Sequence, residues 1–501
     1  MTLDEALYQL KDVQQKIYAL QYAGSAISLD AVTVAPRDTA EGRSLAQGIL
    51  SGYLYPLISG EETGKLLDFL AEHKDELDPL RARQAEELKR QYDELHRMPE
   101  QEYVEYSMLL NDAQTVWHRA KEEDDYAAFA PYLSRIIEAN RKQAAYIDEK
   151  KAPYDALLGQ YERDLTMEQL DGFFSELRQT IVPLLEKIRE KGQVVDDSFL
   201  RQDFPIEKQR ELSDYLMALL GIDRAHCTIG ETEHPFTMNF TKSDVRITTK
   251  YDRGNFISSM YSVIHESGHA LYELGVGDEY QYTVLSGGVS MGIHESQSRF
   301  FENMLGRSEA FIRLIFPKLK ELFPKQLAGV SARDLYLAVN KSEPSLIRTE
   351  ADELTYCLHI MVRYEIEKKM IAGEASVQEL PALWNQKMKE YLGVEAPNDR
   401  EGVLQDSHWS GGAIGYFPSY ALGSAYAAQF MHRMEQDLPV YDLVARGDFR
   451  KINAWLDEHI HRYGCFYPPA ELFKRCCGEE FDPRYYMDYL KKKYGEIYRL
   501  S

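Results

Sequence analysis

Cysteine and long hydrophobic runs are scarce in this chain. Its 501 residues include five cysteines, an odd and sparse set that argues against a disulfide framework. They are Cys227, Cys357, Cys465, Cys476 and Cys477. No run of 18 or more apolar residues is present, so the sequence predicts no transmembrane helix. The N-terminus begins Met-Thr-Leu-Asp-Glu and lacks the basic and then apolar pattern of a signal peptide. We therefore expect a cytoplasmic protein.

Positive charge is also in short supply. The chain has 58 Lys and Arg against 81 Asp and Glu, which gives a formal net charge of −23 and a pI near 5.1. Such a balance opposes binding to nucleic acid or to an anionic membrane surface. We expect neither kind of partner.

The sequence also shows no linker and no internal repeat. The length alone would allow two to four domains, but no long Pro/Gly/Ser-rich stretch, low-complexity run or internal repeat divides the chain. We therefore predict one domain over 1–501, with a helical N-terminal region at 1–195 and a catalytic region at 196–501. Apolar residues recur at 3.6-residue spacing in segments such as 167–191 and 344–371, which predicts a mainly α fold.

Residues 265–269 read His-Glu-Ser-Gly-His, the most informative pattern in the chain. On a helix His265 and His269 lie one turn apart on the same face, so both imidazoles can reach one zinc ion. Glu266 lies about 100° around the helix, beside the metal, where it can act as a general base. Asn255 is a suitable N-cap and Gly275 a suitable end for this helix. The pattern indicates a zinc hydrolase.

A catalytic zinc usually takes three protein ligands and one water, so a further ligand is needed. Glu295 is our preferred candidate, because a second helical pattern follows the break at Ser-Gly-Gly, 286–288, and a helix-loop-helix can bring a downstream glutamate to the metal. His294 is the competing ligand. The alternative with a third histidine in an extended motif is excluded, since Gly275 stands where that histidine would be.

A small β-hairpin is predicted just before this helix. Residues 237–241 and 245–249 have strand-like patterns around a Lys-Ser-Asp turn. Arg246 shares a face with Asp244, which fits either a solvated edge strand with an internal ion pair or an edge strand that pairs with extended substrate. His234 precedes the hairpin and could be structural or could line a cleft.

Two further polar clusters lie downstream. Arg348 and Asp352 are spaced i, i+4 near the start of a helix that we expect to open at Pro344, which fits an ordinary helical salt bridge or an arginine oriented to clamp a carboxylate. Residues 402–420 read as a loop rich in hydrogen-bonding side chains, and loops on rigid scaffolds often carry function. Within it His408 could donate a hydrogen bond to a developing oxyanion, and Tyr420 is a second candidate.

Six motifs in order resemble the signature set of the thermostable carboxypeptidase 1 family of zinc metallocarboxypeptidases. They are His-Pro-Phe at 234, Asp-X-Arg-X-Thr at 244, His-Glu-X-X-His at 265, His-Glu-Ser-Gln at 294, Ile-Arg-X-X-Ala-Asp at 347 and Gly-X-X-Gln-Asp-X-His-Trp at 402.

The resemblance implies a nearly all-α fold with a deep central groove, and a homodimer. It implies an enzyme that releases single residues from peptide C-termini with broad specificity. Carried over to this sequence, His265, His269 and Glu295 bind zinc and Glu266 is the base. Arg348 is then a candidate for binding the substrate carboxylate. The cleft would be lined by His234, Arg246, His408 and Tyr420.

We therefore predict a zinc-dependent metallocarboxypeptidase acting on peptides, in which Glu266 assists the attack of water and zinc lowers the pKa of that water toward about 7. Cobalt or manganese could replace zinc. Two alternatives remain open at this point. One is a zinc endopeptidase or oligopeptidase with the same metal site, and the other is a non-catalytic protein in which zinc only holds helices together.

Overall fold

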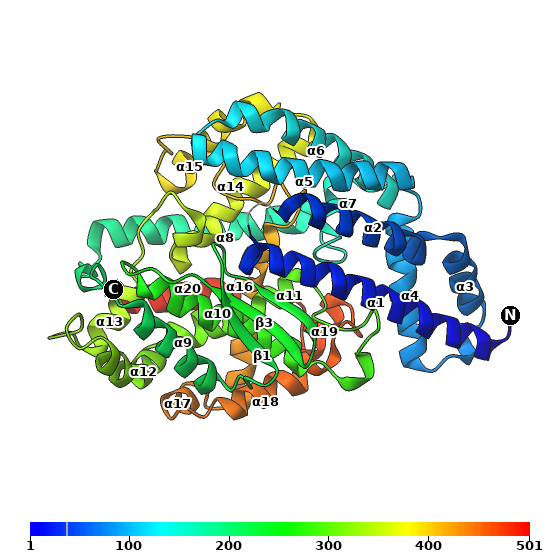
Figure 1. Ribbon diagram of the computed structural model, residues 1–501. Helices are drawn as coiled ribbons and strands as arrows, with labels where there is room; N and C mark the ends of the chain where they lie inside the picture. Colours follow the sequence, from blue (N-terminus) through cyan, green and yellow to red (C-terminus); the bar gives the residue numbers. More distant parts are fainter. Residues whose placement is uncertain (37–38, 501) are drawn as a thin grey trace.

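Helices make up most of the structure, a computed structural model that describes residues 1–36 and 39–500. The mainly α prediction is confirmed, and Figure 1 shows the helices around one small sheet. The helices before the sheet are α1 (Leu3–Thr33), α2 (Ala40–Ser59), α3 (Glu61–Glu72), α4 (Pro79–Leu95), α5 (Glu100–Glu123), α6 (Tyr126–Ile147), α7 (Pro153–Leu158), α8 (Met167–Lys191) and α9 (Ile206–Leu220). Those after it are α10 (Phe256–Gly275), α11 (Met291–Arg299), α12 (Glu309–Leu322), α13 (Ala332–Val339), α14 (Glu353–Ala372), α15 (Leu380–Leu392), α16 (Pro418–Asp437), α17 (Val440–Ala445), α18 (Phe449–His459), α19 (Pro469–Cys477) and α20 (Arg484–Tyr498).

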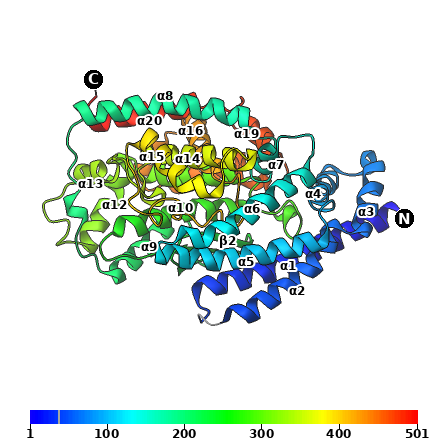
Figure 2. The ribbon, with the colours of Figure 1, turned by 90° about the horizontal axis from the view of Figure 1, so that it is seen from above.

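Segments far apart in the sequence lie side by side. Helix α8 runs along the C-terminal helix α20 in the view from above (Figure 2), and α1 and α2 form a long hairpin in front of α5. The two chain ends lie on opposite sides of the molecule in Figure 1. Within the described ranges, no helix combines the length and the apolar character needed to cross a membrane.

The sheet has three strands in the order β1-β3-β2. The predicted hairpin is confirmed as β2 (Thr237–Thr241) antiparallel to β3 (Asp244–Thr249). A third strand, β1 (Cys227–Glu231), pairs parallel to β3 and was not predicted, because its five residues are too short and too mixed to show a pattern. Arg246 therefore lies on the central strand, and the prediction that it lies on an edge strand is wrong.

Helix α10 is buried because apolar residues cover most of its circumference. Asn255 caps its N-terminus by accepting a hydrogen bond from the Ser258 amide, and the helix ends at Gly275, both as predicted. Helix α11 begins at its N-cap Ser290 and continues as a π-helical turn, η5 (Phe300–Gly306). A π-helical turn is an uncommon element that often occurs at functional sites.

Two glycines let three helices pack with almost no space between them. A Cβ on Gly268 of α10 would lie 2.5 Å from the carbonyl oxygen of Gln297, and a Cβ on Gly423 of α16 would lie 2.5 Å from Cγ of Glu295. Both distances are too short for any larger side chain. Helix α11 is therefore held between α10 and α16, in backbone-to-backbone contact on both sides.

The N-terminal helices hold the loop at 402–417 through hydrogen bonds. On α5, Trp117 donates its indole N–H to the Leu404 carbonyl (3.1 Å) and Lys121 donates to the Gln405 carbonyl (2.7 Å). A separate bond joins α4 to the segment before α19, where Arg83 donates to the carbonyl of Phe466 (2.8 Å). These bonds join the region at 1–195 to the region that follows it.

Candidate metal centre

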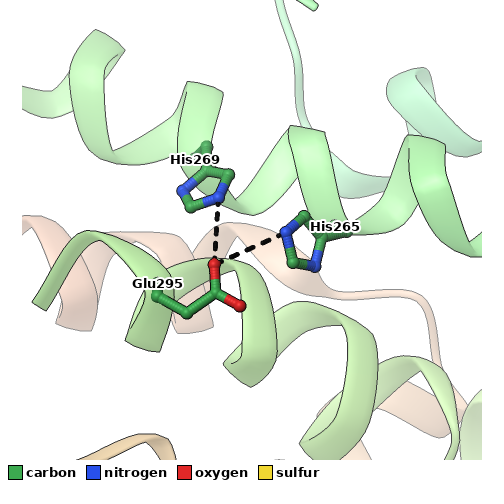
Figure 3. A group of neighbouring side chains, drawn as sticks. All are labelled: His265, His269 and Glu295. Atoms are coloured by element: carbon green, nitrogen blue, oxygen red, sulfur yellow. Dashed lines mark ion pairs between the residues drawn. The ribbon is translucent and has the colours of Figure 1, made fainter. Parts of the chain in front are cut away.

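The three residues that were predicted to bind a metal lie together. His265 and His269 extend from α10, and Glu295 faces them from α11 (Figure 3). Oε2 of Glu295 lies 3.6 Å from Nε2 of His265 and 3.4 Å from Nε2 of His269. The donor atoms of the group lie within 4.8 Å of one another. The competing candidate, His294, lies outside this group and contacts His269 instead.

The orientation of the two histidines suits a divalent cation. Nδ1 of His265 contacts Oε2 of Glu302 (2.8 Å), and Nδ1 of His269 contacts Nδ1 of His294 (2.6 Å). With Nδ1 engaged, each ring turns its Nε2 toward Glu295, as a metal ligand should. Burial lowers the pKa of His269 to about 3, so this imidazole is neutral and its lone pair is free.

The carboxylate of Glu295 is kept ionised by its neighbours. Arg299 donates from Nε to Oε1 (2.7 Å), and Ser298 donates from its hydroxyl to Oε2 (3.0 Å). Burial alone would raise the pKa of Glu295, but Arg299 and the two imidazoles together hold this pKa well below its usual range. Two imidazoles and one ionised carboxylate form the three-ligand donor set of catalytic zinc sites.

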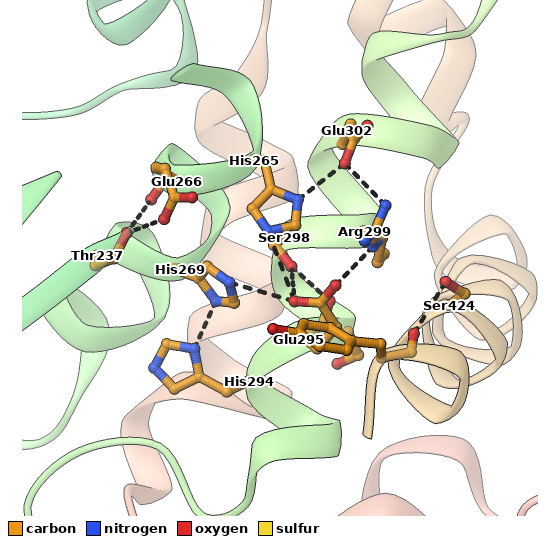
Figure 4. Close-up of polar contacts among 12 residues, drawn as sticks. Thr237, His265, Glu266, His269, His294, Glu295, Ser298, Arg299, Glu302 and Ser424 are labelled. Carbon is orange, nitrogen blue, oxygen red and sulfur yellow. Dashed lines mark hydrogen bonds and ion pairs between the residues drawn. The ribbon is translucent and has the colours of Figure 1, made fainter. Parts of the chain in front are cut away.

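Glu302 and Arg299 support this group, and neither was predicted from the sequence. Glu302 lies on η5 and accepts hydrogen bonds from Arg299 (3.2 Å) and Arg307 (3.1 Å), and the first of these arginines also holds Glu295 (Figure 4). Burial opposes ionisation of Glu302, but Arg299 and the other partners keep its pKa well below the ordinary value. The available signal in the sequence was their helical spacing from Glu295, with Arg299 four residues later and Glu302 seven residues later.

Glu266 lies beside the metal group. It is 5% exposed, and the Thr237 hydroxyl on β2 donates to its Oε2 (2.6 Å). Figure 4 shows it turned toward β2 while the two histidines face α11. Burial raises the pKa of Glu266, which makes the carboxylate a stronger base.

The structure corrects the prediction for Arg348. Helix α14 begins at Glu353, because Asp352 is its N-cap and accepts hydrogen bonds from the amides of Leu354 and Thr355. Arg348 lies before the helix, on the short 3-10 turn η6 (Arg348–Glu350). The predicted i, i+4 salt bridge is therefore wrong, and so is the idea that Asp352 orients the arginine.

Asp406, in the loop at 402–417, is the partner of Arg348. The guanidinium donates to Oδ1 from Nε (3.0 Å) and Nη2 (2.8 Å), and Nη1 donates to the hydroxyl of Tyr356 (3.0 Å). Oδ2 of the same aspartate accepts from Arg363 (2.7 Å). Two buried arginines thus share one carboxylate, which leaves this cluster with an excess positive charge.

His408 and Tyr420 border the arginine cluster. Nε2 of His408 lies 3.0 Å from the Tyr420 hydroxyl, and the Tyr420 ring stacks near the guanidinium of Arg348 (5.0 Å). Burial, together with the positive charge of Arg348, lowers the pKa of His408 to about 3, so its ring is neutral. His408 therefore adds no charge to the cluster.

The metal group and the arginine cluster adjoin through Tyr356. The guanidinium of Arg299 lies 4.2 Å from the centre of the Tyr356 ring, and the hydroxyl of that ring accepts from Arg348. A continuous path therefore connects Glu295 to Arg348. Sequence spacing could not reveal Tyr356 or Arg363, because they reach the site from α14, far along the chain.

Two further predicted residues, Arg246 and His234, make no hydrogen bond or ion pair with the metal group among the described residues. Arg246 makes a two-pronged ion pair with Asp244 (2.8 Å for each bond), as the sequence indicated, and among the described residues it has no hydrogen bond to the metal group. His234 is exposed.

Glu367 on α14 holds the loop at 402–417 and makes the stability of the fold depend on pH. This buried carboxyl accepts from Tyr154 (2.7 Å), Trp409 (2.8 Å) and Gly415 (2.9 Å). Burial raises its pKa from 4.5 to about 7. Because the folded-state pKa is the higher one, its contribution to stability is complete below pH 4.5 and is lost as the pH rises through 7.

We expect Glu367→Gln to flatten this dependence. Between pH 5 and 8 the wild-type protein should lose roughly 1–3 kcal/mol more unfolding free energy than the variant. Denaturant titrations at the two pH values measure the difference. Glu162, another buried carboxyl with a raised pKa, is present in both proteins and cancels from the comparison. Equal losses in the two proteins would contradict the assignment to Glu367.

Comparison with known proteins gives one consistent result. A family model described as "Carboxypeptidase Taq (M32) metallopeptidase" matches residues 9–494. Carboxypeptidase 1 of Bacillus subtilis (strain 168) is 43% identical over 490 residues, which cover 98% of each chain. Thermostable carboxypeptidase 1 of Pyrococcus furiosus is 36% identical over 494 residues, covering 98% of this chain and 99% of that protein. The crystal structure of an M32 carboxypeptidase from Deinococcus radiodurans R1 matches with a TM-score of 0.94 at 35% identity, covering 99% of this chain and 100% of that one.

Proposed function

The chain belongs to the carboxypeptidase Taq (M32) family of metallopeptidases, which are hydrolases acting on peptides, and we propose that it is a zinc-dependent carboxypeptidase that releases single C-terminal residues with broad specificity. The observation that carries this proposal is the juxtaposition of two groups. A three-ligand metal group lies next to a buried arginine cluster with excess positive charge.

The proposed ligands are His265, His269 and Glu295. Together they would hold one zinc ion, which would supply Lewis-acid chemistry to the scissile carbonyl and to the attacking water. Glu266 takes the proton from the attacking water and delivers it to the leaving amine. His408 and Tyr420 are proposed to donate hydrogen bonds to the oxyanion as it forms.

Arg348 is proposed to bind the substrate carboxylate. A guanidinium has five N–H groups, and three hydrogen bonds within the described chain occupy only part of them. The remaining donors and the uncompensated charge suit a terminal carboxylate, which an internal peptide bond lacks. His234 and Arg246 are proposed to line the approach to this position. Selective removal of terminal residues would follow, because a carboxylate held by Arg348 would place the last peptide bond at the metal group.

We expect Arg348→Ala to lower kcat/KM on peptides with a free C-terminus by roughly 10- to 100-fold, because a hydrogen-bonded charge contributes about 1.5–3 kcal/mol. The same peptides with an amidated C-terminus should be affected little. Asp406 keeps Arg363 as a partner, so the fold should survive. Mass spectrometry of both peptide sets measures the rates.

Arg253→Ala is the matched control, since Arg253 forms an exposed ion pair with Asp203. An equal loss on both peptide sets would show that Arg348 only supports the structure. Internal cleavage of amidated peptides at an undiminished rate by the wild-type enzyme would favour the endopeptidase alternative instead.

The assembly and location follow the same proposal. We propose a homodimer, as the family resemblance implies, and a cytoplasmic location. The non-catalytic alternative is disfavoured by the family membership and by the placement of Glu266 beside the metal group.

A further inference from the structure

His294 belongs to the His-Glu-Ser-Gln motif and has no role in the proposed function. Its ring lies against a metal ligand, with Nδ1 2.6 Å from Nδ1 of His269. On its other side, Nε2 lies 2.7 Å from Oε1 of Glu273. A chain of three side chains thus runs from a buried carboxylate, through one imidazole, to a second imidazole in the metal group.

The hydrogen positions in this chain follow from its chemistry. Two facing nitrogens can share only one hydrogen, so one must donate and the other accept. His269 turns Nε2 toward Glu295, and a ligand nitrogen carries no hydrogen, so its Nδ1 carries one and donates to His294. His294 then carries its own hydrogen on Nε2 and donates it to Glu273.

Glu273 is fixed in place as the end of this chain. It is 4% exposed, Oε1 also accepts from the Gly288 amide (3.0 Å), and Oε2 accepts from the side chain of Asn239 (2.6 Å). With every one of these donors aimed at it, the carboxylate acts as an acceptor and holds the His294 tautomer. Asn239 lies on the edge strand β2, two residues from Thr237 and on the same face. One strand face therefore supports both Glu266 and Glu273.

The ring of His294 is closely packed on two sides. A Cβ on Gly288 would lie 2.6 Å from Cδ2 of His294 and 2.7 Å from the ring of Tyr272. The imidazole is therefore enclosed between this glycine and the tyrosine, which faces it with ring centroids 5.3 Å apart.

We propose that Glu273 and His294 form a positioning pair that fixes the tautomer and orientation of His269, and thereby sets the metal affinity of the site. The proposal rests on the metal site of the proposed function. It assigns the two ligand histidines different supports, since His265 has a carboxylate directly behind it and His269 has a carboxylate acting through a second imidazole. Outer partners of this kind typically contribute 10- to 100-fold to metal affinity.

The test compares two substitutions of His294. Phe keeps a ring of similar shape but has no nitrogen, so His294→Phe should raise the zinc dissociation constant by about 10- to 100-fold. Asn places an amide oxygen near the former Nδ1, so His294→Asn should restore the affinity to within roughly 3-fold of the wild type, because His269 regains an acceptor. Competition with a chelator of known affinity, added to the full-length protein, measures these constants without reference to turnover.

A milder variant guards against misfolding. Asn239→Ala removes only the bond to Oε2 of Glu273 and should raise the zinc dissociation constant several-fold, while Thr228→Ala, an exposed position on β1, should leave it unchanged. Equal affinity in wild type and His294→Phe would overturn the proposal. So would equal weakness of the Phe and Asn variants, since that result would show that only ring packing matters. Failure of the wild type itself to bind zinc would instead refute the proposed metal site.

Discussion

Glu266→Gln should lower kcat by about 10²- to 10⁴-fold while zinc binding stays intact. The amide has nearly the same shape as the carboxylate but cannot accept the proton of the attacking water. Thr237 can still donate to the side-chain oxygen, so the packing against β2 should be preserved. Steady-state kinetics and the zinc content of the purified variant are the two measurements.

The control for this experiment is Thr237→Val, which removes the hydroxyl that contacts Glu266 and leaves the base in place. Its activity should fall far less than that of Glu266→Gln. Near-normal turnover in Glu266→Gln with one zinc per chain would exclude Glu266 as the base. A variant that loses zinc would show that Glu266 supports the ligands, and the kinetic loss could then not be assigned to proton transfer.

Removal of the metal should abolish peptide hydrolysis and lower the melting temperature. The proposed ligands converge only in the folded chain, so a metal at 1,000 times its dissociation constant stabilises that state by about 4 kcal/mol. Zinc added back should restore both properties, and cobalt or manganese should restore activity if they fit the same donors. Peptide ladders followed by mass spectrometry, with and without chelator, combined with thermal unfolding, measure the effect.

Glu295→Ala provides the matched control, because it removes one ligand and leaves both histidines. Its melting temperature should respond weakly to added zinc. Full activity of a chelated wild-type sample with no metal detectable by elemental analysis would contradict the proposed function. A zinc-dependent melting temperature of the usual size in Glu295→Ala would contradict the ligand assignment alone.

Local patterns explain why the centre of the site could be predicted. The spacing of His265 and His269 requires only one helix, and its N-cap Asn255 and last residue Gly275 can both be recognised in the adjacent sequence. Glu295 could be found because the loop at 286–288 makes a helix-loop-helix the simplest connection. In each case the relevant partners lie within about thirty residues of one another, where periodicity and turn residues carry information.

The predictions that failed concern residues whose partners lie far away in the sequence. Spacing suggested Asp352 as the partner of Arg348, but Asp352 satisfies the amides at the start of α14, and the arginine turns to Asp406 in a loop 58 residues away. Strand β1 was also missed, because its five residues are short and mixed in character and its partner β3 lies beyond β2 in the sequence. No sequence pattern specifies which buried charge will find which counter-charge once the helices have packed.

The passage of α16 over Glu295 limits how this site could be redesigned. At Gly423 on one side and Gly268 on the other the backbones already touch, so α11 cannot move toward α16 or α10 without a collision. An aspartate at 295 would be one methylene shorter, and the scaffold could not advance to make up the missing length. A larger residue at 423 would displace the carboxylate from the opposite side. The choice of ligand and the choice of glycine are therefore a single design decision, and an engineer who wishes to alter the coordinating group must rebuild the crossing of the helices first.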